Sequence, residues 1–410
     1  MEHKCRFCGK ELRVVFADLN MAPTVNNYIG EENRYKSETT YPLITYVCEE
    51  CKLVQTLDFN PCDEIFTEDY AYFSSYSSSW LKHCKTYSDM ICERLHLDKN
   101  SHVMEVASND GYMLQYFKGK NIPHLGVEPC KSVADVAIKK GISTLIDFFT
   151  AELGNNVPKS DLICMCNVLA HVPDINDFVQ GMKNALKPTG TITIEFPHLL
   201  NIIKYNQFDT IYHEHYSYLS LIFAIKLFEK NGLKIYDVEK LPTHGGSLRI
   251  YGCHEEASFH ITKNVKEVLD EEYTLGLDNV ETYKKYAEKV KSTKRAFLKV
   301  LVDIKDQGKS IVAYGAAAKG NTLFNYCGIS TDFIDYSVDL NPHKQNTYLP
   351  GSHIPVYCPE KIRETKPDYI LITPWNIKDE IIKQLDYTTE WGCKFIVAIP
   401  KAEVLSWALN

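Results

Sequence analysis

Residues 102–112 read H-V-M-E-V-A-S-N-D-G-Y, an apolar run that ends in a tight turn of small and polar residues. Further apolar runs follow at 124–128, 161–166 and 191–196, and helical patterns separate them. Strands that alternate with helices in this way form a parallel sheet that is covered on both faces. The sequence therefore predicts an α/β domain, with the turn after residue 106 at the carboxyl edge of its sheet.

The rest of the chain divides around this domain. Its 410 residues are enough for two or three domains. Residues 1–61 are rich in strands and turns and carry two cysteine pairs, and residues 62–278 contain the α/β pattern. A polar helical stretch opens residues 279–410, where a second strand-and-helix series begins at residue 310. We therefore expect a small N-terminal module, a central α/β domain and a C-terminal Rossmann-like domain.

The overall charge and hydropathy exclude some classes of function. The net charge is −8, from 45 basic and 53 acidic residues, and broad nucleic-acid binding needs a cationic face instead. No stretch approaches the roughly 20 apolar residues that span a bilayer, and the first residues lack the apolar core of a signal peptide. We expect a cytoplasmic protein without nucleic-acid or membrane partners. Its oligomeric state is left open, and a monomer is compatible with the sequence.

Two cysteine pairs stand near the N-terminus in a C-x₂-C…C-x₂-C pattern: Cys5, Cys8, Cys48 and Cys51. Each pair fits one tight knuckle, and two knuckles place four thiolates at the corners of a tetrahedron, as Zn²⁺ prefers. Four thiolates close the coordination shell, so the pattern predicts structural rather than catalytic zinc. Redox pairs and isolated buried thiols are the alternative interpretations.

The turn after residue 106 lacks the G-x-G-x-x-G pattern with which a nicotinamide site approaches a pyrophosphate. S-adenosylmethionine carries no phosphate, so one tight turn is enough for it. Glu128 ends the next strand, where a carboxylate can bind ribose hydroxyls or simply cap the strand. Asp147 and Phe148 follow the third strand and would meet the adenine. The predicted cofactor-binding residues are Glu105, Ala107, Ser108, Asn109, Gly111, Glu128, Asp147, Phe148 and Asn167.

The densest polar cluster, Y-H-E-H-Y at 212–216, follows the fifth strand, where ligands gather in such folds. The H-E-x-x-H spacing of metalloproteases is absent, so a second metal is not expected. In the C-terminal domain, G-A-A-A-K-G-N at 315–321 follows a strand and opens a helix, whose N-terminus attracts anions. A plain turn is the alternative. The predicted substrate-binding residues are His244, Gly245, Ser247, Lys319, Asn321, Asp339, His343 and Lys344, with both lysines and His343 as phosphate contacts.

Six motifs together resemble those of the nucleotide-sugar 3-C-methyltransferases of deoxysugar pathways, and the resemblance runs nearly end to end. The motifs are C-x₂-C…C-x₂-C, E-V-A-S-N-D-G-Y, N-V-L-A-H-V-P-D, D-T-I-Y-H-E-H-Y-S-Y, H-G-G-S-L-R and A-Y-G-A-A-A-K-G-N-T. The resemblance implies a class I S-adenosylmethionine methyltransferase core and a nucleoside-diphosphate 4-keto-6-deoxy sugar as substrate. It implies His215 as general base, Tyr212 and Glu214 as its neighbours, and His171 and Tyr76 as further active-site positions.

The chemistry of that reaction agrees with the residue types. A hydrogen on C3 is acidified by the neighbouring C4 ketone, and a neutral histidine near pH 7 is suited to remove it. We expect Glu214 to orient or polarise the imidazole. The rival enzyme is an O-methyltransferase on the same scaffold, and the rival of another class is a zinc-ribbon binding or scaffold protein. The motifs serve several sugars and leave dTDP, GDP and CDP open as the nucleotide.

Overall fold

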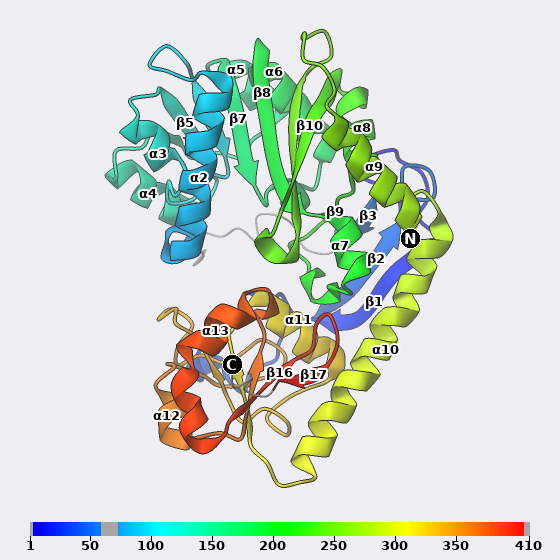
Figure 1. Cartoon of the computed structure of the whole chain (residues 1–410), viewed down its shortest axis with the longest axis vertical. Helices are drawn as coiled ribbons and strands as arrows, with labels where there is room; N and C mark the ends of the chain where they lie inside the picture. The colour runs from blue at the N-terminus through cyan, green and yellow to red at the C-terminus, as the bar shows by residue number, and fades with distance from the viewer. Residues whose placement is uncertain (1–2, 59–72, 406–410) are drawn as a thin grey trace.

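The computed structural model describes residues 3–58 and 73–405. Within these residues the strands form three sheets (Figure 1). The largest sheet lies in the upper half of the molecule, the C-terminal sheet lies in the lower half, and the N-terminal sheet lies between them at one side (Figure 1). The long helix α10 (Val280–Lys305) runs along that side and connects the two halves (Figure 1).

The upper sheet has seven strands in the order β10-β11-β8-β7-β4-β5-β6. Strands β4 to β8 are parallel, and β11 runs antiparallel between β8 and β10. The chain adds strands in one direction from β4 and in the other from β7, which puts a switch point between them. This arrangement confirms the predicted class I methyltransferase core. The strands are β4 (Val103–Val106), β5 (His124–Val127), β6 (Thr144–Leu145), β7 (Ser160–Cys166), β8 (Leu186–Pro197), β10 (Leu233–Leu241) and β11 (Ser247–His254).

Helices cover this sheet because each has an apolar face. In α6 (Ile175–Ala185), for example, Phe178 and Met182 are buried among strand residues such as Ile163 and Ile192. Asp174 begins α6 by accepting hydrogen bonds from the backbone of Asn176 and Asp177. The other helices here are α2 (Ser78–Leu95), α3 (Leu114–Gly119), α4 (Lys131–Lys139), α5 (Ala151–Asn156), α7 (Leu199–Lys204), α8 (Leu221–Lys230) and α9 (Lys263–Leu275).

The N-terminal sheet is completed by a strand from far along the chain. Its order is β1-β2-β3-β9, formed by β1 (Val14–Ala22), β2 (Tyr41–Val47), β3 (Val54–Thr56) and β9 (Ser217–Tyr218). Strand β9 pairs antiparallel with β3, with Val54 opposite Tyr218. Because β9 directly follows the Y-H-E-H-Y cluster, the N-terminal sheet fixes the position of that segment.

The lower domain has a mostly parallel sheet in the order β14-β13-β12-β15-β16-β17, of which β17 is antiparallel. The strands are β12 (Ile311–Tyr314), β13 (Ser337–Val338), β14 (Val356–Tyr357), β15 (Tyr369–Ile372), β16 (Lys394–Val397) and β17 (Glu403–Leu405). The helices are α11 (Ala318–Cys327), α12 (Lys361–Thr365) and α13 (Lys378–Gln384).

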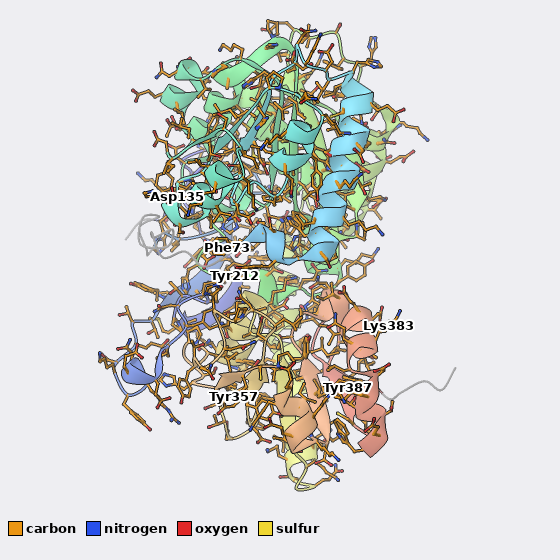
Figure 2. All side chains as sticks on the ribbon, turned by 90° about the vertical axis from the view of Figure 1, so that its left-hand side faces the viewer. Phe73, Asp135, Tyr212, Tyr357, Lys383 and Tyr387 are labelled. Atoms are coloured by element: carbon orange, nitrogen blue, oxygen red, sulfur yellow. The ribbon has the colours of Figure 1, made fainter. Side chains whose placement is uncertain are left out.

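The two halves meet around the carboxyl end of the upper sheet. Figure 2 shows Phe73 and Tyr212 at this junction, far from Tyr357 and Tyr387 in the lower domain. One apolar core links N-terminal and C-terminal elements here, since Phe16 of β1 packs against Tyr286 of α10 with ring centroids 4.5 Å apart. Among the helices of the described residues, none has the length and apolar character that a bilayer span requires.

Candidate active site

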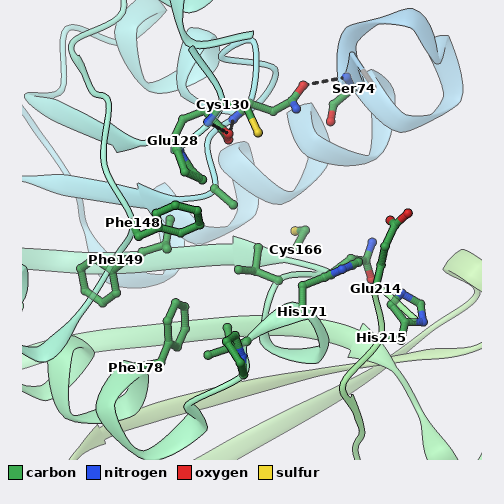
Figure 3. Close-up of a pocket in the computed structure, with 18 of the residues that line it drawn as sticks. Ser74, Glu128, Cys130, Phe148, Phe149, Cys166, His171, Phe178, Glu214 and His215 are labelled. Atoms are coloured by element: carbon green, nitrogen blue, oxygen red, sulfur yellow. Dashed lines mark hydrogen bonds between the residues drawn. The ribbon is translucent and has the colours of Figure 1, made fainter. Parts of the chain in front are cut away.

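A cavity of about 670 Å³ lies where the two halves meet. Its lining comes from all three parts of the chain, including Asn26, Glu128, His215 and Lys319. Figure 3 shows Phe148, Phe149 and Phe178 on one side of the cavity and His171, Glu214 and His215 on the other. The cavity therefore joins the predicted cofactor turn to the predicted catalytic segment.

The turn after β4 has a compact backbone that few residues adopt. Ala107, Asn109 and Gly111 all have positive φ angles, of 56°, 49° and 78°. A side chain at Gly111 would also meet Ile142, whose Cδ1 lies 2.2 Å from the position of an added Cβ. The Asn109 side chain accepts a hydrogen bond from the Ser74 backbone at 2.9 Å. The turn thus brings Ala107 and Asn109 to the cavity wall.

Glu128 fastens this turn to the next strand. Its two carboxylate oxygens accept hydrogen bonds from the backbone N–H groups of Asn109 and Cys130, each at 2.9 Å. The residue is 4% exposed and lines the cavity, and burial raises the pKa of its carboxyl group. Each oxygen keeps a second lone pair, so the carboxylate can also accept hydrogen bonds from a ligand.

An aromatic slot adjoins Glu128. Phe149 and Phe178 lie edge to face, with ring centroids 5.4 Å apart, and both line the cavity with Phe148 and Asp147. Phe148 is 44% exposed, so its ring is available to a ligand. A flat apolar slot beside a buried carboxylate fits the adenosine of S-adenosylmethionine.

His215 is held as a neutral imidazole. Its Nδ1–H donates a hydrogen bond to the backbone carbonyl of Thr210 at 2.9 Å, which leaves the lone pair on Nε2. Its ring lies 4.0 Å from the ring of Tyr212 and 4.7 Å from that of His171, between centroids. Burial, with the nearby charges of His171 and Lys319, lowers the pKa of His215 well below its usual value.

Glu214 differs from the sequence expectation. The carbonyl of Thr210, rather than Glu214, accepts the hydrogen bond from Nδ1–H of His215. Glu214 instead accepts a hydrogen bond from the side-chain amide of Asn26 at 2.7 Å. Burial raises the pKa of Glu214 to about 7. In this structure the Thr210 carbonyl, rather than Glu214, therefore orients the imidazole, and the expectation that Glu214 polarises it stays a prediction.

Backbone contacts from both ends of the chain hold the predicted catalytic segment. Thr56 on β3 donates its hydroxyl to the His215 carbonyl at 2.9 Å, and its N–H to the Tyr216 carbonyl at 3.1 Å. On the other side, the Thr322 hydroxyl of α11 donates to the Ile211 carbonyl at 3.1 Å. The segment is therefore fixed between the N-terminal sheet and the lower domain.

The lower domain contributes a cationic wall. Ala317, Ala318 and Lys319 begin α11 and line the cavity together with Lys344. The Lys319 ammonium lies 4.7 Å from the centroid of the Trp375 ring, and burial lowers its pKa. Lys344 donates to the Ala316 carbonyl at 2.7 Å. The wall can therefore bind an anionic ligand.

Two further loops meet beside this wall. The side-chain amide of Asn167 donates to Nε2 of His244 at 2.9 Å, and both residues line the cavity. Trp80 of α2 packs edge-on against His244, with ring centroids 5.5 Å apart. Burial and the charge of Lys319 lower the pKa of His244 to about 4, so this imidazole is neutral near pH 7.

The structure places most predicted site residues around the cavity. The residues that line it are Ala107, Asn109, Glu128, Asp147, Phe148, Asn167, His171, Tyr212, Glu214, His215, His244, Lys319 and Lys344. The predicted residues outside its lining are Tyr76, Glu105, Ser108, Gly111, Gly245, Ser247, Asn321, Asp339 and His343.

The surroundings of each of these residues explain why it does not line the cavity. Tyr76 points into solvent and is 65% exposed. Glu105, Ser108 and Ser247 are buried beneath the cavity wall. The Asn321 amide donates to the Val25 carbonyl at 2.6 Å, so it holds the N-terminal segment. The remaining positions, Gly111, Gly245, Asp339 and His343, shape or brace the turns beside the cavity.

Sequence reasoning missed residues whose role depends on distant contacts. Asn26 reaches the cavity from the N-terminal module, and no local pattern marks it. Thr210 acts through its backbone carbonyl, which has no sequence signature. Phe149 had a weak signal, because it directly follows Asp147 and Phe148, whereas Phe178 lies within α6, where no local pattern marks it.

The four N-terminal cysteines come together as predicted. Their sulfur atoms all lie within 4.8 Å of one another, with 3.6 Å between Cys5 and Cys51 and 3.5 Å between Cys8 and Cys48. A tetrahedron with Zn–S distances of about 2.3 Å places its sulfurs roughly 3.8 Å apart. The donor set and its spacing therefore fit a zinc ion.

Comparisons with known proteins cover nearly the whole chain. Residues 5–66 match the model of a zinc binding domain, residues 82–238 that of a methyltransferase domain, and residues 242–400 that of a C-methyltransferase C-terminal domain. The chain is 33% identical over 407 residues to C-methyltransferase NovU of Streptomyces niveus, which covers 98% of this chain and 97% of that protein.

Solved structures of other methyltransferases match less than half of this chain. Magnesium protoporphyrin IX methyltransferase from Synechocystis PCC 6803 is 11% identical with a TM-score of 0.35, over 43% of this chain and 84% of its own. An S-adenosylmethionine-dependent methyltransferase from Clostridium acetobutylicum is 12% identical with a TM-score of 0.34, over 42% and 92%. From the full-length match and the family models, the chain belongs to the family of C-methyltransferases that includes NovU.

Proposed function

We propose that this enzyme transfers a methyl group from S-adenosylmethionine to C3 of a nucleoside-diphosphate-linked 4-keto-6-deoxy sugar. One observation carries the proposal: a single cavity contains Glu128 and the aromatic slot at one end, and His215 and a cationic wall at the other. The methyl donor and an anionic sugar nucleotide can therefore meet beside a neutral imidazole.

His215 would act as the general base. Because its Nδ1 proton is committed to Thr210, Nε2 is the atom that accepts the proton from C3 of the sugar. The electrons of that C–H bond move into the ring, and the charge develops on the C4 oxygen. Tyr212 and His171, whose rings adjoin His215, flank this position.

The residues at the other end of the cavity fit the methyl donor. Glu128 would accept hydrogen bonds from the ribose, and Phe148, Phe149 and Phe178 would enclose the adenine. When bound there, S-adenosylmethionine supplies a methyl group on a sulfonium centre, which keeps the carbon–sulfur bonding electrons. No acid from this chain is needed to activate that leaving group.

The diphosphate would lie at the N-terminus of α11, beside Lys344. Backbone N–H groups at a helix start attract anions, and Ala317 and Ala318 leave room for close approach. The cysteine cluster lies apart from the cavity, and we propose that it holds structural zinc. Metal analysis of the purified chain should find one zinc ion per chain, and a metal-free folded chain would refute this.

The replacement His215→Asn tests the proposal. An Asn side-chain amide can still donate to Thr210, but it removes the Nε2 base. We expect methyl transfer, and exchange of the C3 hydrogen in deuterated water, to fall by about 10²–10⁴-fold. The affinity for S-adenosylmethionine should stay within twofold of wild type.

His213→Asn is the matched control, since His213 belongs to the same motif but faces Tyr41 on β2, with ring centroids 6.0 Å apart. It should keep activity within about threefold of wild type. Normal turnover by His215→Asn would contradict the base assignment. A product methylated on oxygen, without C3 exchange, would favour the O-methyltransferase alternative.

A further inference from the structure

We propose that Lys319 is a catalytic residue whose ammonium group binds the C4 oxygen of the keto sugar and stabilises the enolate that forms there. This inference rests on the proposed function and deepens it. It replaces the phosphate contact that the sequence predicted for Lys319, and it assigns the diphosphate to α11 and Lys344.

The first support is an ammonium group with donors to spare. The Lys319 Nζ atom is buried and has no hydrogen-bond acceptor among the described residues. It faces the cavity, and the Trp375 ring covers one side of it. A buried charge is costly unless it is paired. An anionic oxygen inside the cavity would supply the missing partner.

The nearest acidic side chain is already engaged. Asp209 is buried, and its Oδ2 accepts a hydrogen bond from the Trp375 indole at 2.6 Å. No ion pair among the described residues joins Asp209 to Lys319. Its charge still acts on Lys319 from beyond contact distance. Asp209 therefore favours the charged ammonium without occupying its hydrogen-bond donors.

The second support is the position of Lys319 beside the base. Lys319, His215 and His244 all line the same cavity, and the charge of Lys319 contributes to lowering the pKa of both imidazoles. In the sugar, C4 adjoins C3, whereas the diphosphate hangs on C1 across the ring. A cation close to the group that deprotonates C3 is therefore placed for the C4 oxygen rather than for the diphosphate.

The third observation is that the helix start on which Lys319 lies is packed tightly against its neighbours. Lys319 is the second residue of α11, and Gly320 packs this helix start against Thr373, with 3.0 Å between a Cβ at position 320 and Cβ of Thr373. Thr322 of the same helix donates to Ile211, just before the catalytic segment. One helix therefore ties the ammonium to the segment that contains the base.

The proposed reaction moves one proton to His215 and one electron pair to the C4 oxygen. His215 Nε2 takes the C3 proton, the C–H electrons form a C3–C4 double bond, and the carbonyl π electrons move to oxygen. The Lys319 ammonium binds that oxyanion without giving up its proton. The carbonyl re-forms as C3 takes the methyl group, the methyl–sulfur bond breaks with its electron pair left on the sulfur, and His215 releases its proton to water. A fixed donor that meets charge as it develops is typically worth 10²–10³-fold in rate.

The experiment compares Lys319→Met and Lys319→Gln with wild type. The substrate is the 4-keto-6-deoxyglucose of whichever nucleotide the wild-type chain methylates best among dTDP, GDP and CDP. Three quantities are measured: exchange of the C3 hydrogen in deuterated water without methyl donor, kcat for methyl transfer, and the Kd of the matching free nucleoside diphosphate. The Kd of S-adenosylmethionine reports whether each variant is folded.

We expect exchange and kcat to fall at least 100-fold in both variants, while both dissociation constants stay within threefold of wild type. Near-normal exchange with at least tenfold weaker nucleoside-diphosphate binding would overturn the inference in favour of a phosphate contact. Unchanged values throughout would also overturn it. If wild type neither exchanges nor methylates any of the three sugars, the proposed function itself fails.

Discussion

Two strand-turn-helix junctions lie on opposite sides of the cavity, and in each an acidic residue accepts hydrogen bonds from the backbone of the neighbouring turn. In the upper domain, Glu128 follows β5 and accepts a hydrogen bond from the turn amide of Asn109 at 2.9 Å. In the lower domain, Asp339 follows β13 and accepts one from the turn amide of Ala316 at 2.8 Å. Each acid also accepts a second backbone hydrogen bond, from Cys130 and Asn341.

The difference lies in what each acid faces. Glu128 lines the cavity, whereas Asp339 lies outside its lining, 3.8 Å from the ammonium of Lys344. The upper junction therefore presents a carboxylate to the cavity, and the lower junction presents lysines to it. Under the proposed function, the two junctions would bind a cationic methyl donor and an anionic sugar nucleotide, because a few side chains set the local potential.

The largest expected effect on ligand affinity comes from Glu128→Gln. The amide must turn its NH₂ group toward one backbone N–H, so the turn and the ribose contact are both weakened. We expect S-adenosylmethionine affinity, measured by calorimetry, to fall about 10–100-fold, with nucleoside-diphosphate affinity unchanged. Asp135→Asn, an exposed carboxylate on α4, is the control and should behave as wild type.

The pH dependence sharpens the same test. Burial raises the pKa of Glu128, so its carboxylate is lost on acidification at a higher pH than an ordinary glutamate, whose pKa is about 4.3. Wild-type affinity for the methyl donor should therefore fall as the pH drops through that raised pKa. Glu128→Gln should give a flat curve over the same range, and parallel curves would contradict a role for this carboxylate.

A smaller effect is expected from Lys344→Gln in the lower junction. It removes one cation from the cavity wall, so nucleoside-diphosphate affinity should fall about 5–10-fold, as for a partly desolvated ion pair. S-adenosylmethionine affinity should not change. Lys383→Gln on the exposed side of α13 is the control. Equal losses of both ligands would show that the two junctions do not bind separately.

The smallest ligand effect is expected from Asp339→Asn. This change disturbs backbone hydrogen bonds rather than a ligand contact. The free energy of unfolding should fall by about 1–2 kcal/mol, while the nucleoside-diphosphate Kd stays within threefold of wild type. A tenfold loss of affinity without a loss of stability would make Asp339 a ligand contact and remove the contrast with Glu128.

The same contrast shows how far sequence reasoning reaches. The apolar runs predicted the α/β layers, and the two C-x₂-C pairs predicted the cysteine cluster, because both signals are local. Glu128 and Asp339 have the same local pattern, so the sequence named both as ligand contacts. Only the packing around each acid shows that Glu128 lines the cavity, whereas Asp339 supports a turn outside its lining.

Long-range contacts were beyond prediction for a related reason. Asn26 donates a hydrogen bond to Glu214, which is 188 residues further along the chain, and β9 completes a sheet that begins at residue 14. The acceptor for His215 is the carbonyl of Thr210, and every residue has a carbonyl. Such partners are chosen by tertiary geometry, which leaves no pattern in neighbouring residues.

The pairing of β3 with β9 has a consequence for recombination between relatives. A chimera that exchanged only residues 3–58 would join Asn26 and Thr56 of one parent to the catalytic segment of the other. Mismatches there would shift the imidazole even if both parents were active. Because segments 3–58 and 209–218 contact each other directly, we expect functional hybrids to need both segments from the same parent.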